Sequence, residues 1–131
     1  MVRTVALSSG VGMMTGRLVV VVDDEPDLRS LICEVLEEEG YSVVSLPHPS
    51  LALGLEQMPS LFLIDLMLPG MTGIELAQQL RQGPFGETGM IGLSASSAML
   101  RHANDSHLFQ ETIQKPFDLE YLLEAVRQHV A

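Results

Sequence analysis

Cysteine, tryptophan and basic residues are scarce in this chain of 131 residues, which has one cysteine, no tryptophan and a single lysine. One thiol excludes an intramolecular disulfide and a cysteine-rich metal site, which fits a reducing compartment, so we assign the chain to the cytoplasm. No apolar run approaches the roughly 18 residues that span a bilayer. The 7 Lys and Arg face 17 Asp and Glu, for a net charge of −10. Because phosphates and anionic lipids repel such a chain, we expect no direct nucleic-acid or membrane partner.

The apolar sequence that is present, 47% of the chain, is enough for the core of one domain. Residues 1–17 have no sustained periodicity and are interpreted as a flexible N-terminal tail, whereas residues 18–131 form the predicted domain. Short β-branched or apolar runs predict strands at 18–22, 42–46, 61–65, 89–94 and 109–113.

Apolar residues at helical spacing predict helices between these strands. The first is capped by Asp27 and ended by Gly40, and the others cover 49–58, 74–82, 97–107 and a final segment capped by Asp118. Strands alternating with helices predict an α/β fold, a doubly wound five-stranded parallel sheet with helices on both faces.

Polar side chains gather where the predicted strands end. Asp23 and Asp24 follow the first strand, Asp65 ends the third, Ser94 ends the fourth and Lys115 follows the fifth. Ligands bind at this edge of parallel sheets. Two carboxylates about 4 Å apart repel each other by roughly 4 kcal/mol at an effective dielectric constant near 20, so convergent acids require compensation. Mg²⁺ and the flexible ammonium of Lys115 can both supply it.

Four motifs occur in order along the chain: Val-Val-Asp-Asp-Glu-Pro at 21–26, Leu-Ile-Asp-Leu-Met-Leu-Pro-Gly-Met-Thr-Gly at 63–73, Leu-Ser-Ala at 93–95 and Lys-Pro-Phe at 115–117. With these motifs the sequence resembles the receiver domain of two-component response regulators from about residue 18 to its end. The resemblance implies a flavodoxin-like sheet with strand order 2-1-3-4-5 and identifies residues 18–131 as the receiver domain.

The resemblance also implies a phosphoryl acceptor and a metal site. Asp65 would accept the phosphoryl group from a sensor histidine kinase or phosphotransfer protein, as covalent carboxylate catalysis requires. Asp24 and Asp65 would bind Mg²⁺ directly, Asp23 would act through water, and the backbone carbonyl of Met67 would complete the set. The expected domain is a signalling switch and not a turnover enzyme, and it acts on a downstream protein or a covalently linked output domain.

Two further positions are implied to report phosphorylation. Lys115 would pair with Asp65 at rest and with a phosphoryl oxygen afterwards, and the hydroxyl of Ser94 would turn inward to the same group. The peptide bond from Lys115 to Pro116 is commonly cis in this family. Ser94 is the first of the family's two switch positions. The second is usually an aromatic residue but here is Thr112, and the segment before it lacks the usual Gly-Ala step. These departures put the usual signalling surface in question.

Other functions stay open on the sequence alone. The unusual Thr112 keeps open a receiver-like binding module that acts without phosphorylation. A phosphatase of the haloacid-dehalogenase type also uses a strand-end aspartate with Mg²⁺, but it needs a second acid two residues later, where this chain has Met67. A flavin-binding protein could share the fold, but acidic strand ends would repel the flavin phosphate.

Overall fold

The sheet in this computed structural model, which describes residues 16–130, has five parallel strands in the order β2-β1-β3-β4-β5. This result confirms the predicted doubly wound sheet and its strand order. The strands are β1 (Leu18–Val22), β2 (Ser42–Leu46), β3 (Leu61–Asp65), β4 (Gly89–Ser94) and β5 (Glu111–Gln114). Most of the expected tail, residues 1–15, lies outside the described residues, whereas Gly16 and Arg17 hydrogen-bond through their backbones to Gly40 and Ser42.

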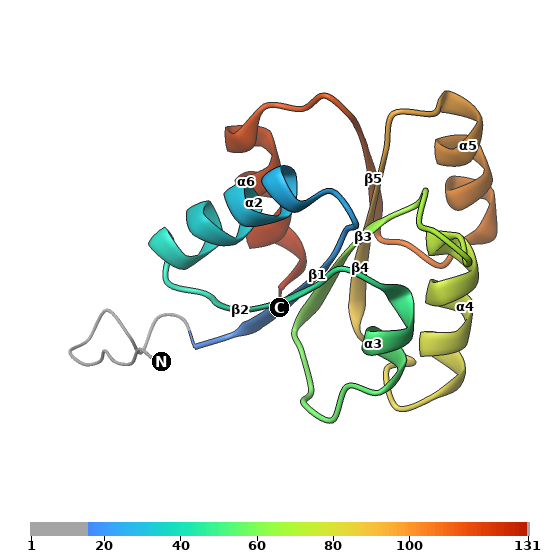
Figure 1. Cartoon of the computed structure of the whole chain (residues 1–131), viewed down its shortest axis with the longest axis horizontal. Coiled ribbons are helices and arrows are strands. Elements are labelled where there is room, and N and C mark those ends of the chain that lie inside the picture. The colour runs from blue at the N-terminus through green and yellow to red at the C-terminus, as the bar shows by residue number, and fades with distance from the viewer. Residues whose placement is uncertain (1–15, 131) are drawn as a thin grey trace.

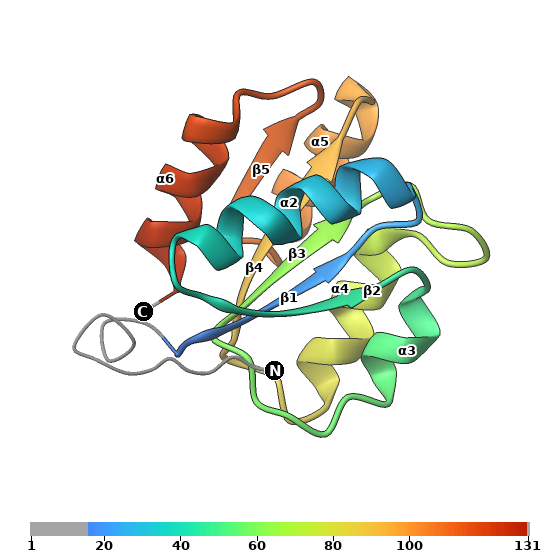
Figure 2. The same ribbon diagram turned by 60° about the vertical axis from the view of Figure 1, so that its left-hand side comes forward.

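Helices cover both faces of the sheet (Figures 1 and 2). They are α2 (Pro26–Glu38), α3 (Pro49–Leu53), α4 (Gly73–Gln82), α5 (Ser97–Ser106) and α6 (Leu119–His129). Helices α2 and α6 pack on one face, and α3, α4 and α5 lie on the other. No helix in residues 16–130 is both long enough and apolar enough to cross a bilayer.

The valines of β1 show why a continuous apolar run forms the middle of this sheet. Val19 and Val21 belong to the apolar cluster under α2 and α6, whereas Val20 and Val22 belong to the cluster under α3 and α4. All four side chains are fully buried. Alternate residues of a strand face opposite sides, so a strand covered on both sides has no position for a polar side chain until it ends.

Two predicted helix boundaries were wrong. Asp27 does not cap α2, which begins at Pro26 with Glu25 in the N-cap position. Proline suits this first helical position because it has no amide proton to leave unpaired. The helix predicted over 49–58 ends at Leu53, where Gly54 follows. Glycine loses more backbone freedom in a helix than other residues, so it favours an early end.

The predicted fifth strand at 109–113 was also displaced, since β5 is Glu111–Gln114. The ring of Phe109 lies directly over Gly92, 3.3 Å from the position a side chain there would take. Phe109 therefore packs on the sheet face as part of the connection from α5. The strand then ends immediately before Lys115, which continues from it to the carboxyl edge of the sheet.

Candidate functional site

The carboxylate of Asp23 is fully buried just beyond the end of β1. Its Oδ1 accepts a hydrogen bond from the Glu25 amide at 2.9 Å, and its Oδ2 lies 3.2 Å from Nζ of Lys115. The neighbouring Asp24 is exposed. The two acids at the end of β1 thus differ, because Asp23 is committed to partners inside the protein whereas Asp24 faces solvent.

Asp65 brings a second buried carboxylate to the same edge from the end of β3. Its side chain is only 7% exposed, with Oδ1 accepting from the Met67 amide at 3.0 Å and Oδ2 at 3.3 Å from Nζ of Lys115. The following loop returns closely against this residue. A side chain added to Gly73 would collide with the Asp65 carbonyl oxygen, so only glycine fits there.

Three carboxylates converge as the sequence predicted. Asp23, Asp24 and Asp65 can each place one ligand oxygen within 4.8 Å of the other two. At this spacing each pair of anions repels by about 3–4 kcal/mol at an effective dielectric constant near 20, and the ammonium of Lys115 offsets only part of the repulsion. A cluster of oxygen ligands with excess negative charge suits a hard divalent cation, and Mg²⁺ therefore fits these residues.

The site shifts the pKa values of its two central groups. Burial raises the pKa of Asp65, and the nearby charge of Asp23 adds to this rise against the opposing hydrogen bond from Met67 and the charge of Lys115. For Lys115, burial works to lower the pKa, but the carboxylates of Asp23 and Asp65 outweigh it, so its pKa lies above the usual value. Lys115 therefore stays charged, whereas ionisation of Asp65 has a cost.

Ser94 reaches this edge, and Thr112 does not. Ser94 is 1% exposed at the end of β4, and its carbonyl accepts from the Lys115 amide at 2.8 Å. Its hydroxyl accepts from the Ser96 amide at 3.0 Å. Thr112 pairs in register with Gly92, and its hydroxyl lies 3.0 Å from Oδ1 of Asn104 on α5.

Met67, Pro116 and Arg29 complete the surroundings of the site. Met67 lies in the loop after β3 as an exposed residue, and its amide is already bound to Asp65. The Lys115–Pro116 peptide bond is cis. Sequence reasoning missed Arg29, whose Nη1 donates to the backbone carbonyl of Asp23 at 2.7 Å. Its place one helical turn after Glu25 could have pointed to this contact.

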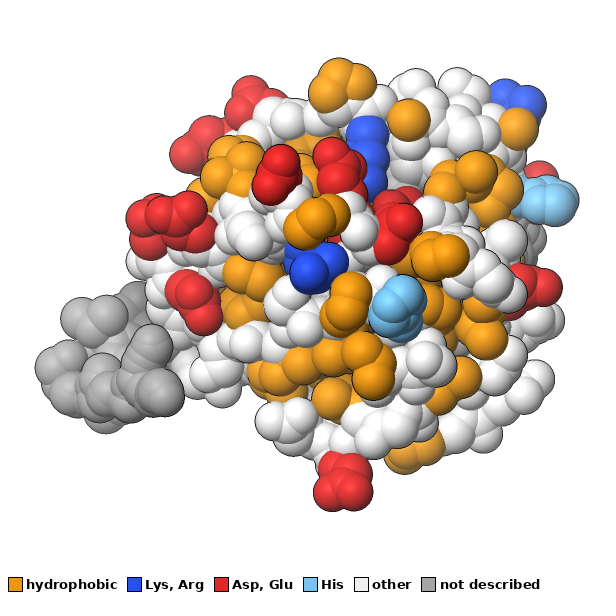
Figure 3. All heavy atoms as spheres, viewed as in Figure 1, with side chains coloured by type: hydrophobic (Ala, Val, Ile, Leu, Met, Phe, Trp, Pro, Cys, Tyr) orange, Lys and Arg blue, Asp and Glu red, His pale blue; other side chains and the backbone are white. Residues whose placement is uncertain are grey.

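Charged groups are visible on the surface over this part of the molecule. In Figure 3, acidic side chains gather over the upper part of the face, with basic side chains among them. Of the residues described, those that could together hold a metal ion are Asp23, Asp24 and Asp65.

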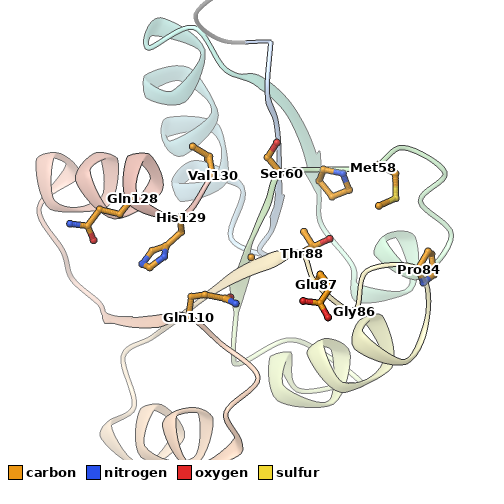
Figure 4. A pocket seen from close by; sticks show the side chains of 12 residues that line it. Met58, Ser60, Pro84, Gly86, Glu87, Thr88, Gln110, Gln128, His129 and Val130 are labelled. Atoms are coloured by element: carbon orange, nitrogen blue, oxygen red, sulfur yellow. The ribbon is translucent and has the colours of Figure 1, made fainter.

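A hollow of about 580 Å³ lies at the opposite, amino-terminal edge of the sheet (Figure 4). Among its lining residues the only acid is Glu87. Its histidine, His129, lies 2.9 Å from Oε1 of Glu111, and its Gln110 accepts from the Met90 amide. The hollow offers no convergent carboxylates, so the carboxyl edge is the candidate site.

Comparisons with known proteins agree with this geometry. The family model of the response regulator receiver domain matches residues 19–127. An uncharacterised 14.6 kDa protein of Leptolyngbya boryana is 36% identical over 115 residues, covering 85% of this chain and 88% of that protein. Sporulation initiation phosphotransferase F of Bacillus subtilis is 28% identical over 129 residues, which cover 89% of this chain and 96% of that protein.

Solved structures give the same result. The response regulator TrrA of Thermotoga maritima, crystallised in complex with Mg²⁺ and BeF, superposes with a TM-score of 0.77 at 32% identity, covering 86% of this chain and 97% of that one. The family match includes all three clustered acids, Ser94 and Lys115. The chain therefore belongs to the receiver domain family of two-component response regulators.

Proposed function

We propose that this chain accepts a phosphoryl group on Asp65 in a Mg²⁺-dependent reaction and thereby switches a protein-binding surface. One observation carries the proposal: Asp65 is a buried carboxylate held by the Met67 amide and Lys115, with Asp23 and Asp24 close enough to share a cation. The solved complex of TrrA with Mg²⁺ and BeF supports the choice of metal. The name of the Bacillus subtilis relative, a phosphotransferase, supports the chemistry.

The transfer forms one bond and breaks another. A carboxylate oxygen of Asp65 attacks the phosphorus of a phosphohistidine, the P–N bond breaks, and the histidine leaves with a proton from solvent. The Met67 amide keeps the attacking carboxylate oriented through its bond to Oδ1. Asp24, Asp65 and the Met67 carbonyl would hold Mg²⁺, which would supply positive charge to neutralise the charge on the phosphoryl group.

Two side chains connect the acyl phosphate to the rest of the domain. Lys115, now shared between Asp23 and Asp65, can follow an oxygen of the phosphoryl group because an ammonium is not restricted to a planar fork. Ser94 can donate its hydroxyl proton to another oxygen, which pulls its Oγ from the Ser96 amide. Ser96 caps α5, so this movement shifts the amino-terminal end of that helix.

The wider role follows from this chemistry. We propose a sensor histidine kinase or phosphotransfer protein as phosphodonor, and a downstream protein or covalently linked output domain as the recipient of the signal. Residues 18–131 act as the receiver, in the cytoplasm. The domain catalyses only its own phosphorylation and dephosphorylation.

Intact mass spectrometry tests the acceptor. The native chain is incubated with Mg²⁺ and acetyl phosphate beside Asp65→Asn and, as a matched control, Asp105→Asn, which changes an exposed acid on α5. We expect one phosphoryl adduct on the native chain and on the control, and none on Asp65→Asn. An adduct that persists in Asp65→Asn would place the acceptor elsewhere, and its absence from the native chain would reject the proposal.

A binding module that acts without phosphorylation is the second candidate. The hydrogen bond from Thr112 to Asn104 favours it, because it ties β5 to α5 where an aromatic switch residue is usual. Beryllofluoride with Mg²⁺ separates the two functions. The switch predicts shifted amide resonances around Ser94 and Lys115. Unchanged spectra would reject the switch and favour the binding module.

A further inference from the structure

We propose that Arg29 is a positioning residue of the phosphoacceptor site, which holds the β1–α2 loop so that Asp24 faces the metal position. This inference rests on the proposed function for its purpose, but the geometry behind it is independent of phosphorylation. Arg29 is half-buried on the first turn of α2, and its Nη1 donates to the Asp23 carbonyl at 2.7 Å.

Arg29 acts where the ladder between β1 and β2 ends. The amide of Asp23 still donates to the carbonyl of Leu46 at 3.1 Å, but the last residue of β1 is Val22. The Asp23 carbonyl therefore lies beyond the ladder and takes its hydrogen bond from the guanidinium. A hydrogen bond from a charged donor is about twice as strong as a neutral one, so this contact is a firm anchor.

Three hydrogen bonds enclose Asp24. The Asp23 carboxylate accepts from the Glu25 amide at 2.9 Å, the Glu25 carbonyl accepts from the Arg29 amide at 3.0 Å, and the Arg29 side chain returns to the Asp23 carbonyl. Asp24 lies between Asp23 and Glu25, whose backbone groups these hydrogen bonds hold. Its side chain is exposed, and the direction of its carboxylate is set by this fixed backbone.

The anchor replaces a missing helix cap. Glu25, in the N-cap position of α2, forms no side-chain cap with any residue in the described part of the chain. Aspartate, serine or threonine there would normally fix the turn into the helix. Without it, the contact from Arg29 to Asp23 ties the first turn of α2 to the end of β1, beside the hydrogen bond from the Glu25 amide to the Asp23 carboxylate.

A positioning role and a purely electrostatic role of Arg29 predict opposite effects on the affinity for Mg²⁺. As a cation near three carboxylates, it weakens the attraction of Mg²⁺, so its removal would tighten binding if charge were its main effect. As a positioning residue, its removal frees Asp24 and weakens binding. The direction of the change therefore distinguishes the two.

Isothermal titration of Mg²⁺ into the full chain tests this with Arg29→Met and the conservative Arg29→Lys, which keeps a charged donor. Arg17→Met, an exposed arginine at the opposite edge of the sheet, is the control. We expect Arg29→Met to weaken Mg²⁺ binding about tenfold, the loss that fits one charge-assisted hydrogen bond, with partial recovery in Arg29→Lys. Tighter or unchanged binding in Arg29→Met would overturn the proposal.

A second readout needs no metal. Hydrogen exchange at the Glu25 amide, measured by NMR without Mg²⁺, should be about tenfold faster in Arg29→Met and partly restored in Arg29→Lys. Equal exchange in the native chain and Arg29→Met would overturn the positioning role. If the native chain binds no Mg²⁺, the proposed function fails, and this exchange measurement still decides the role of Arg29.

Discussion

His107 carries a conformational cost that other residues avoid. It follows the last turn of α5 with φ of 60°, and within residues 16–130 it is the non-glycine residue with a positive φ. An L-residue pays roughly 1–2 kcal/mol to adopt the left-handed region, which is why glycine usually ends helices there. His107 lies in the segment before β5 that lacks the usual Gly-Ala step.

Replacing His107 by glycine should therefore stabilise the protein. We expect His107→Gly to raise the free energy of unfolding by about 1 kcal/mol, because relief of the left-handed strain exceeds the added entropy of the unfolded chain. Urea denaturation measures the change. His102→Gly, within the same helix, should instead lose about 1 kcal/mol. A loss of stability in His107→Gly would contradict this account.

At the scale of single residues, the sequence predicted positions better than contacts. Asp23, Asp65 and Lys115 were expected together because strand ends of a parallel sheet share one edge. The hydrogen bonds of Arg29 and Thr112 could not be predicted this way, since they depend on side-chain directions relative to a helix. Spacing along the chain determines which edge of the sheet a residue reaches, but it does not determine the hydrogen-bond partner of its side chain.

Among the secondary-structure elements, α4 is joined to the rest of the fold through Arg81 in its last turn. Its guanidinium donates through Nε and Nη2 to the carbonyl of Leu108, and through Nη1 to the carbonyls of Gly86 and Thr88. Burial lowers the pKa of Arg81. One side chain thus fastens α4 to the connections that precede β4 and β5.

Arg81→Lys should lower the free energy of unfolding by about 2 kcal/mol, because one ammonium cannot serve three carbonyls in different directions. Arg101→Lys, on the exposed surface of α5, is the matched control and should change it by less than about 0.5 kcal/mol. Urea denaturation of both variants checks this. Equal stability of the two would mean that the Arg81 contacts contribute nothing beyond charge.

The same contacts explain why β5 was predicted two residues too early. Periodicity places Phe109 at the start of a strand, but the carbonyl of the preceding Leu108 is bound to Arg81 and its amide to the hydroxyl of Ser106. Leu108 is thus held outside the sheet, and the bonding to β4 begins with the Gln110 amide, which donates to the Met90 carbonyl at 2.9 Å. Patterns of apolar residues identify a strand and its face, whereas its ends depend on such competing hydrogen bonds.

The molecule as a whole concentrates its polar chemistry on one edge of an otherwise apolar sheet. Its strand order follows from alternating elements and right-handed crossovers, so the sequence predicted it well. The consequence is that the folded state must hold Asp23, Asp24 and Asp65 near one another with Lys115 as the counter-charge. The clustered acids therefore impose a stability cost that belongs to the fold and not to any one element.

This cost predicts how stability depends on pH. Because the pKa of Asp65 is raised above its usual value of 3.8 in the folded state, ionisation favours unfolding, and stability is lost as the pH rises from 3.8 through the raised pKa. Asp65→Asn removes the charge. We expect it to raise the melting temperature at pH 7 by a few degrees, roughly 3–6 °C for each kcal/mol relieved, with no difference below pH 3.8.

Mg²⁺ should reverse the order of the melting temperatures of the native chain and Asp65→Asn. A ligand that binds only the folded state stabilises it in proportion to the logarithm of its concentration over its Kd, so the native chain gains stability from Mg²⁺ while Asp65→Asn gains less. Thermal scans at pH 7 with increasing Mg²⁺ check this, with Asp105→Asn as a control that should follow the native chain. If Asp65→Asn melted below the native chain without Mg²⁺, the attraction of Lys115 would outweigh burial and repulsion, and the clustered acids would stabilise the fold even without a metal ion.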